Sequence, residues 1–170
     1  ATPTALSKRL VNAHDVLIVD RDGKVRAGRR QVFSEWSLHR VAYGARASVR
    51  AVIHAHPPTA AGFAVALKAL PAPAIAEMVV SLGREIPLVP YAFPKSAAGD
   101  HALSEALAEH NVVLLGNHGV LAIGDDLEQA YLRMELCEHW ARIALVAHAL
   151  GGVAALPPED INVLLEARAA

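Results

Sequence analysis

Residues 112–123 read Val-Val-Leu-Leu-Gly-Asn-His-Gly-Val-Leu-Ala-Ile, and this stretch decides the fold. Two short apolar runs, Val112–Leu115 and Val120–Ile123, lie on either side of a glycine-bounded turn that contains His118. Apolar runs of this length, separated by turn residues, are typical of buried strands that form a hairpin. We therefore expect two buried antiparallel strands joined by a turn that directs His118 beyond the edge of the sheet.

Four further extended segments are indicated. Val16–Asp20 is an apolar run followed by Asp22-Gly23, a hairpin signal, with Val25 beginning the returning strand. Arg50–His54 is typical of a strand that enters the core. Pro87–Tyr91 is expected to be short and extended, because a residue that precedes proline is driven away from helical conformation.

Apolar spacing, capping residues and prolines mark the helices. The expected helices are Glu35–Tyr43 with Ser34 as N-cap and Gly44 at its end, one beginning at Pro58, one from an Asp100 cap to His110, the longest over Leu127–Ala149, and a last one opened by Pro157-Pro158. Interleaved helices and strands with two hairpins predict an α/β domain with a mostly antiparallel central sheet.

Length and composition predict one domain, residues 1–170. The chain is 54% hydrophobic and 19% charged, with a formal net charge of -1, so it has no basic face for nucleic acid. No apolar run is long enough to cross a bilayer, and the start lacks a signal-peptide pattern. The lone cysteine, Cys137, cannot form an internal disulfide, and we expect it to be buried. These features favour a cytoplasmic protein with a small-molecule substrate.

His54-Ala55-His56 follows the apolar run of the strand predicted before it. Side chains at i and i+2 of a strand share a face, so both imidazoles are expected to point the same way and could bind zinc. The alternative for such a pair is one imidazole bonded to the backbone and the other in solvent. Together with His118, the pair could supply three imidazoles and leave coordination positions open, as in a catalytic site. Five other histidines are expected to be solvated: His14, His101, His110, His139 and His148.

Four short motifs occur in one order along the chain: Ser34-Glu35-Trp36, His54-Ala55-His56-Pro57, Val89-Pro90-Tyr91-Ala92 and Asn117-His118-Gly119-Val120. In this order they resemble the class II aldolase/adducin-like family, and within it the fuculose-1-phosphate aldolase branch. The resemblance implies a three-layer α/β/α sandwich around a mostly antiparallel sheet. It also implies a homotetramer with active sites at the subunit interfaces.

The resemblance further implies the site residues. The metal ligands would be His54, His56, His118 and Glu35, and the metal Zn2+, with Mn2+ or Fe2+ also compatible with imidazole ligands. Glu35 would also be the catalytic acid/base, and Tyr91 the proton donor, reached from the adjacent subunit. Thr4 and Ser34 would bind the substrate.

This sequence departs from the family pattern in three places. The family's phosphate-binding Gly-Asn-Ser-type loop lies upstream of the position of Ala1, Phe33 replaces the first residue of a Ser-Ser pair, and Ala5 replaces a glycine beside Thr4. The expected activity is aldol cleavage of a small sugar phosphate, or a related hydroxy-carbonyl compound, through a metal-stabilised enediolate. Glu35, in place of the aspartate of related epimerases, favours cleavage over epimerisation. A metal-dependent decarboxylase or dehydratase that acts on a non-phosphorylated acid, and a non-catalytic adducin-type module, stay open.

Overall fold

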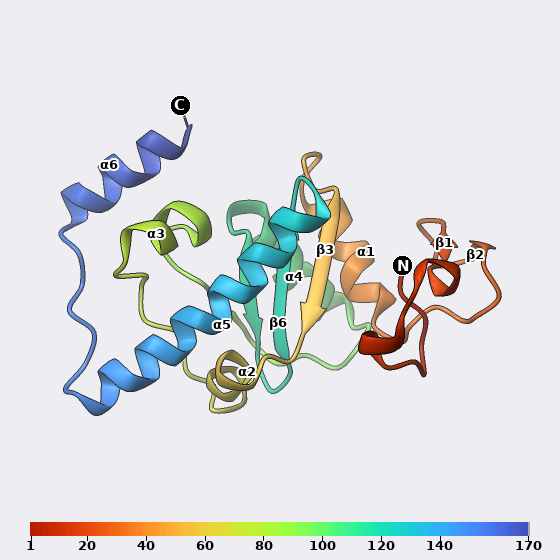
Figure 1. Ribbon diagram of the computed structural model, residues 1–170, viewed down its shortest axis with the longest axis horizontal. Coiled ribbons are helices and arrows are strands. Elements are labelled where there is room, and N and C mark those ends of the chain that lie inside the picture. Colours follow the sequence, from red (N-terminus) through yellow and green to blue (C-terminus); the bar gives the residue numbers. More distant parts are fainter. Residues whose placement is uncertain (170) are drawn as a thin grey trace. The chain divides into compact units, whose positions relative to one another are not determined.

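The computed structural model describes residues 1–169 (Figure 1). The chain divides into two compact units, Ala1–Val41 and Ala42–Ala170. The prediction of a single domain over residues 1–170 stays a prediction, and the two units are described separately.

The N-terminal unit contains the predicted hairpin. Strands β1 (Ile18–Val19) and β2 (Val25–Ala27) pair antiparallel, and Gly23 in the turn has a φ of 81°, a conformation that glycine adopts without strain. The Asp20 carboxylate accepts hydrogen bonds from the backbone N–H groups of Asp22 and Lys24, so one side chain fixes the turn. This prediction is confirmed.

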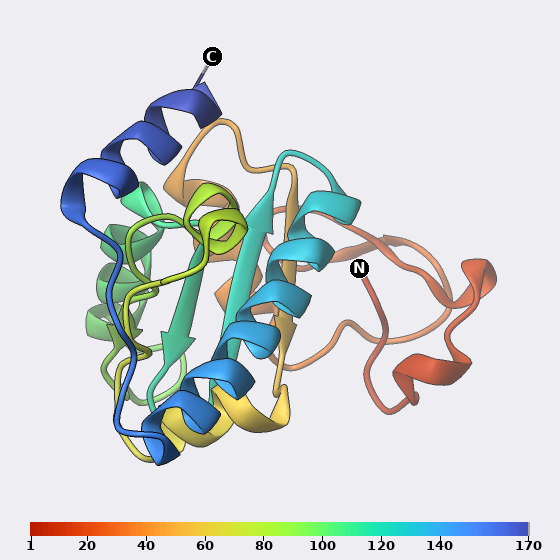
Figure 2. The same ribbon diagram turned by 60° about the vertical axis from the view of Figure 1, so that its left-hand side comes forward.

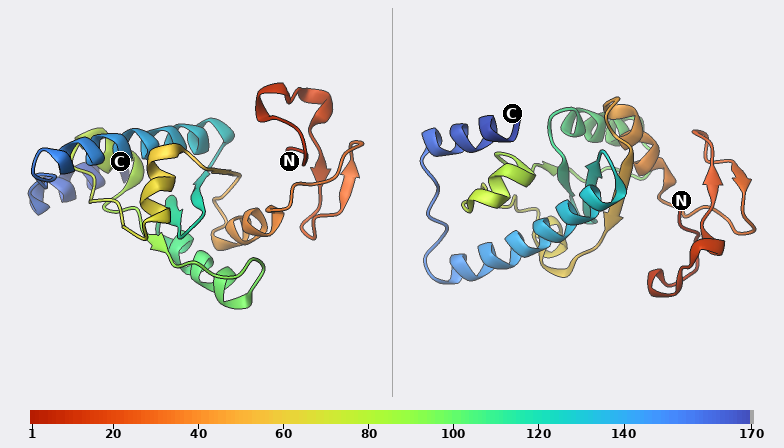
Figure 3. Two further views of the ribbon diagram at one scale, coloured as in Figure 1. Left: turned by 90° about the horizontal axis from the view of Figure 1, so that it is seen from below. Right: turned by 45° about the horizontal axis from the view of Figure 1, so that its top comes forward.

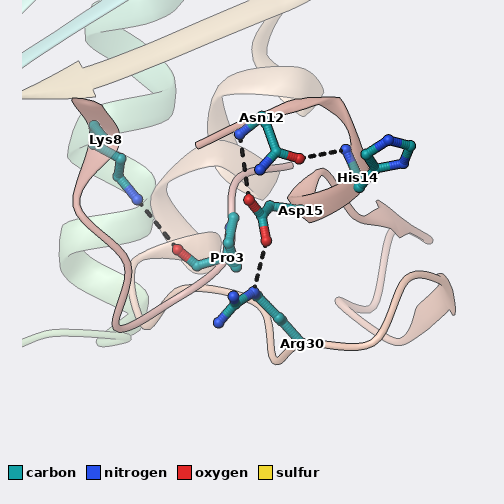
Figure 4. Close-up of polar contacts among 6 residues, drawn as sticks. All are labelled: Pro3, Lys8, Asn12, His14, Asp15 and Arg30. Atoms are coloured by element: carbon teal, nitrogen blue, oxygen red, sulfur yellow. Dashed lines mark hydrogen bonds and ion pairs between the residues drawn. The ribbon is translucent and has the colours of Figure 1, made fainter. Parts of the chain in front are cut away.

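Before the hairpin lie two short 3-10 helices, η1 (Lys8–Leu10) and η2 (Ala13–Asp15). Asn12 and Asp15 form a capping box at η2, and the Asp15 carboxylate also accepts from Arg30 Nε at 2.9 Å (Figure 4). The hydrogen bond from the Asn12 backbone holds the pKa of Asp15 below its ordinary value. After the hairpin comes helix α1 (Trp36–Ala45), which contains the boundary between the units. It continues through Gly44, which was predicted to end it.

The second unit is built on a four-stranded sheet in the order β3 (Ala51–Ala55), β6 (Gly119–Gly124), β5 (Val112–Leu115) and β4 (Leu88–Val89). The pairs β3–β6 and β5–β6 are antiparallel, which confirms the hairpin over residues 112–123. Strand β4 pairs with β5 in parallel. The sheet is therefore mixed, and the expected mostly antiparallel sheet is replaced by this arrangement. The α/β class is confirmed.

Five helices belong to the second unit alone: α2 (Pro58–Val65), α3 (Ala76–Leu82), α4 (Ala97–Glu109), α5 (Leu127–Ala149) and α6 (Pro158–Ala169). The predicted bounds of α5 are confirmed, and its N-cap Asp126 accepts from Gln129 N–H. The predicted Asp100 cap is wrong, because the Ser96 hydroxyl caps α4 by accepting from Gly99 N–H and Asp100 lies within the helix.

Helices lie on both faces of this sheet. Helix α5 crosses β6 and β3 on one face, and α4 contacts β4 and β5 on the other (Figures 1 and 3). Figure 2 shows α5 in front of the neighbouring strands. The core includes Trp140, whose indole N–H donates to Pro71 O, and Cys137, which is fully buried as predicted. The complete three-layer sandwich stays a prediction.

None of the helices within residues 1–169 is both long and apolar enough to span a membrane.

Candidate metal centre

The sheet register brings two ligand-bearing segments to one edge. In the β3–β6 pair Ala55 lies opposite Val120, and in the β5–β6 pair Leu115 lies opposite Gly119. Strand β3 therefore ends where the β5–β6 turn begins. Because β3 carries His54, with His56 just beyond its end, and the turn carries His118, pairing of the backbones alone places all three histidines at the same edge.

The three imidazoles lie close together. The ring centroid of His54 lies 4.9 Å from that of His56 and 4.6 Å from that of His118, and the His56–His118 separation is 5.0 Å. His54 Nε2 and His56 Nε2 are 3.2 Å apart, and one ring nitrogen from each of the three lies within 4.8 Å of the others. Two nitrogens bound tetrahedrally to zinc would be about 3.3 Å apart. The predicted convergence is confirmed, and this donor set fits a divalent metal.

The orientation of the His54 ring is set by the sheet. His54 Nδ1 lies 2.8 Å from the carbonyl oxygen of Val120 on β6. A carbonyl can only accept, so Nδ1 carries the proton and Nε2 presents its lone pair towards the other rings. Nε2 is therefore the His54 nitrogen that can bind a metal, and the hydrogen bond to Val120 fixes the orientation of the ring.

Backbone contacts hold the turn that carries His118. Asn117, with a φ of 53°, adopts a left-handed conformation that asparagine tolerates better than most residues, and its N–H donates to Ala64 O on α2 at 3.0 Å. The Gly116 N–H donates to Val89 O at 2.8 Å, and His118 N–H to Leu115 O at 3.0 Å. The turn is therefore tied to α2, β4 and β5 at once.

The other predicted site residues are distributed over both units. Thr4, Ser34 and Glu35 lie in the N-terminal unit, where Thr4 N–H donates to Gln31 O, Ser34 is exposed and Glu35 is half-buried just before α1. Tyr91 lies in the second unit after β4, and its side chain is 59% exposed. Their roles at the centre stay predictions.

An aromatic cluster in the N-terminal unit was not predicted. The rings of Phe33 and His39 meet edge to face with centroids 4.7 Å apart, and Trp36 stacks on His39 at 6.4 Å. The three-residue spacing along the start of a helix was the available signal. Phe33 therefore packs against the rings of Trp36 and His39.

The histidines predicted to be solvated divide into two groups. Four are exposed as expected: His14, His101, His139 and His148. His110 is partly buried, and its Nε2 lies 3.6 Å from the Glu85 carboxylate. The prediction for His110 is therefore wrong in part.

The sequence model of the class II aldolase and adducin N-terminal domain family matches residues 1–145. The chain belongs to this family. A class II aldolase family member, the L-fuculose phosphate aldolase of Escherichia coli O6:H1, is 33% identical over 171 residues, which cover 97% of this chain and 76% of the relative. The 5-deoxy-D-ribulose 1-phosphate aldolase of Bacillus thuringiensis is 28% identical and covers 95% of this chain and 75% of the relative.

A solved structure of L-fuculose 1-phosphate aldolase superposes with a TM-score of 0.88 at 29% identity, covering 99% of this chain and 79% of that one. These findings confirm the resemblance drawn from the four motifs. They also identify the chain described here as an enzyme, a metal-dependent lyase of the aldolase type.

Proposed function

We propose that this chain catalyses reversible aldol cleavage of a small sugar phosphate, with a divalent metal held by His54, His56 and His118. The observation that carries the proposal is the convergence of three imidazoles at one sheet edge, with two Nε2 atoms 3.2 Å apart. Aldolase relatives named for fuculose phosphate and 5-deoxyribulose 1-phosphate support the substrate class.

Zn2+ is the metal that we propose, because three neutral nitrogen donors with open positions are the usual ligand set of catalytic zinc, although Mn2+ and Fe2+ also accept imidazole. When bound, the cation supplies Lewis acidity that polarises the substrate carbonyl and stabilises negative charge beside it. The three neutral imidazoles add no negative charge of their own to the ion, which suits this chemistry.

Glu35 is proposed as a further ligand and as the acid/base of the reaction. In cleavage, the bond between the α-carbon and the hydroxyl-bearing β-carbon breaks, its electron pair stays on the α-carbon of the ketone fragment, and the Glu35 carboxyl donates a proton to that α-carbon. In synthesis the Tyr91 phenol donates its proton to the alkoxide that forms from the aldehyde oxygen, and in cleavage the resulting phenolate takes that proton back from the substrate hydroxyl. General acid–base help of this kind contributes about 10²–10⁴ in rate.

The substrate anion and the assembly complete the proposal. Thr4 and Ser34 would bind the phosphate through hydroxyl and backbone N–H donors. We also propose a homotetramer in which Tyr91 reaches the centre of a neighbouring subunit. The exposure of Tyr91 in the single chain, 59%, and of Phe93 nearby, 77%, supports a surface that another subunit covers.

A direct test combines metal analysis with isotope exchange. The purified protein, loaded with Zn2+, is assayed on a panel of ketose 1-phosphates and non-phosphorylated keto acids. Glu35→Gln is then compared with Glu109→Gln, an exposed carboxylate at the end of α4. We expect Glu35→Gln to slow deuterium exchange at the substrate carbon by about 10²-fold or more, with Glu109→Gln unchanged. Exchange at the parental rate in Glu35→Gln would remove Glu35 from the mechanism, and turnover of keto acids alone would overturn the sugar-phosphate assignment.

A further inference from the structure

Glu138 on α5 is a largely buried carboxylate bound to the start of another helix. Its side chain is 13% exposed, and Oε2 accepts from the backbone N–H groups of Thr59 at 3.0 Å and Ala60 at 2.9 Å. The N-cap of α2 is Pro57, which forms no side-chain capping bond. The first N–H groups of a helix need acceptors that the helix itself cannot supply. Glu138 supplies them from 78 and 79 residues away along the chain.

Helix α2 connects the two ligand-bearing segments of the candidate centre. It begins at Pro58, two residues after His56. Near its other end, Ala64 O accepts the N–H of Asn117, the residue before His118. Any displacement of α2 therefore moves His56 through the chain and His118 through this hydrogen bond.

The packing of α2 on α5 depends on small residues. Ala60 and Ala64 are fully buried in the same cluster as Cys137 and Ala141 of α5. Such side chains allow a close approach, but methyl groups interlock weakly and restrain sliding less than directional hydrogen bonds do. The Glu138 carboxylate provides that directional restraint. It is itself held by Arg142 Nε, 2.9 Å from Oε1.

We propose that Glu138 is a positioning residue for the metal centre: by fixing α2 against α5, it sets the separation of His56 and His118. The inference rests on the proposed metal site, whose ligands it orients without touching the ion. Partners that orient metal ligands typically contribute about 10–100-fold to metal affinity. A purely structural role would instead lower the stability of the fold and leave the affinity of the folded protein unchanged.

The test measures Co2+ binding to the full chain, because the d–d absorption of Co2+ reports ligand geometry. The informative variants are Glu138→Gln, which removes the charge and leaves one acceptor oxygen in place of two, and Glu138→Asp, which keeps the charge but is one methylene shorter. Glu135→Gln is the matched control, since it removes an exposed carboxylate of the same helix that has no bond to α2 among the described contacts.

We expect Glu138→Gln to weaken Co2+ binding about 10–100-fold, with altered d–d bands. Glu138→Asp should show a smaller effect in the same direction. If Glu138→Gln does not fold, Glu138→Asp is the variant that tests the positioning role. Glu135→Gln should bind as the parent does. Independently of metal, amide hydrogen exchange in the apo protein should accelerate over residues 56–64 and 116–118 in the Glu138 variants alone.

The outcomes separate the two proposals. Parental affinity and parental spectrum in a folded Glu138 variant would overturn the positioning role and leave the metal site intact. A parent protein that binds no Co2+ would overturn the metal site, and with it this inference.

Discussion

The His56 imidazole lies directly against the backbone of Gly119. A β-carbon built on Gly119 would come within 2.5 Å of His56 Cδ2 and 2.7 Å of the Ala55 carbonyl oxygen. Gly119 pairs with Leu115 at the start of β6, so the strand cannot retreat without losing its register. The absence of a side chain at Gly119 is therefore what admits His56 to the cluster.

Gly119→Ala should disable the centre. The methyl group would displace the His56 ring or the end of β3, and we expect Zn2+ affinity to fall about 10-fold or more. Gly62→Ala is the control, because Gly62 lies exposed on α2 with no atom within 4 Å of the added carbon. Competition with a chromophoric chelator measures the Zn2+ affinity of both variants. Parental affinity in Gly119→Ala would show that the His56 imidazole can shift away from residue 119 and still bind the metal.

His56→Ala should remove the metal and leave the domain folded. His56 is exposed, so its truncation deletes a ligand but little packing. Metal content after dialysis should fall to background, with the circular dichroism spectrum and urea midpoint close to those of the parent. His148→Ala, an exposed histidine on α5, should retain metal. Full metal occupancy in His56→Ala would contradict its assignment as a ligand.

The fold was predictable wherever the signal is local in sequence. Periodicity and end residues located α5, and apolar runs around turn residues located both hairpins. The convergence of His54, His56 and His118 follows from the same reasoning, because i and i+2 side chains share a strand face and a hairpin turn lies at a sheet edge.

What the sequence did not disclose depends on long-range contacts. An extended segment was expected over Pro87–Tyr91, but not the parallel pairing of β4 with β5, and helix α3 was not predicted. The bonds from Glu138 to α2 join residues far apart in the chain, and no pattern in one sequence reports them. Ser96 and Asp100 were both chemically suitable caps, and the choice between them is made by the turn before α4.

Ala5→Gly should stabilise the protein. Ala5 has a φ of 54°, in the left-handed region where a β-carbon costs about 1–2 kcal/mol. Glycine relieves this strain but adds about 0.4–1 kcal/mol of unfolded-state entropy, so we expect a net gain of about 0.5–1 kcal/mol in the free energy of unfolding by urea. Ala108→Gly, at an exposed position of α4, should be destabilising. A loss of stability in Ala5→Gly would mean that the strain is not present.

Cys137 should be unreactive in the folded protein. Burial, with a smaller contribution from the nearby Glu138 charge, raises the pKa of its thiol to about 12. Its thiolate fraction at pH 8 should be about three orders of magnitude below that of an unfolded cysteine. An aromatic disulfide reagent should therefore label the protein slowly until urea unfolds it, with Cys137→Ala as the blank. The Cys137 thiol has a higher pKa in the folded state than in the unfolded chain. The free energy of unfolding is therefore at its full value below the unfolded pKa and falls as the pH rises above it. Rapid labelling without urea would refute this burial.

The stabilising effect of Glu138 should depend on pH. Burial alone would raise the pKa of this carboxyl, but hydrogen bonds from Ala60 and Thr59 and the bond from Arg142 outweigh it and hold the pKa below the ordinary value. A lowered folded pKa means that the stabilisation is complete above the unfolded pKa and is lost as pH falls through the folded one. Glu138→Gln should therefore cost about 1–2 kcal/mol of unfolding free energy at pH 7, as for loss of a helix cap.

The difference between parent and Glu138→Gln should shrink steadily in urea titrations carried out below pH 4, where the parent carboxyl becomes protonated and resembles the amide. Glu135→Gln, on the same helix but exposed and bonded only to the Tyr131 hydroxyl among the described contacts, controls for a general change in the charge of α5. A stability deficit in Glu138→Gln that stays constant from pH 7 to acid would show that lost packing, and not the charged bonds to α2, accounts for it.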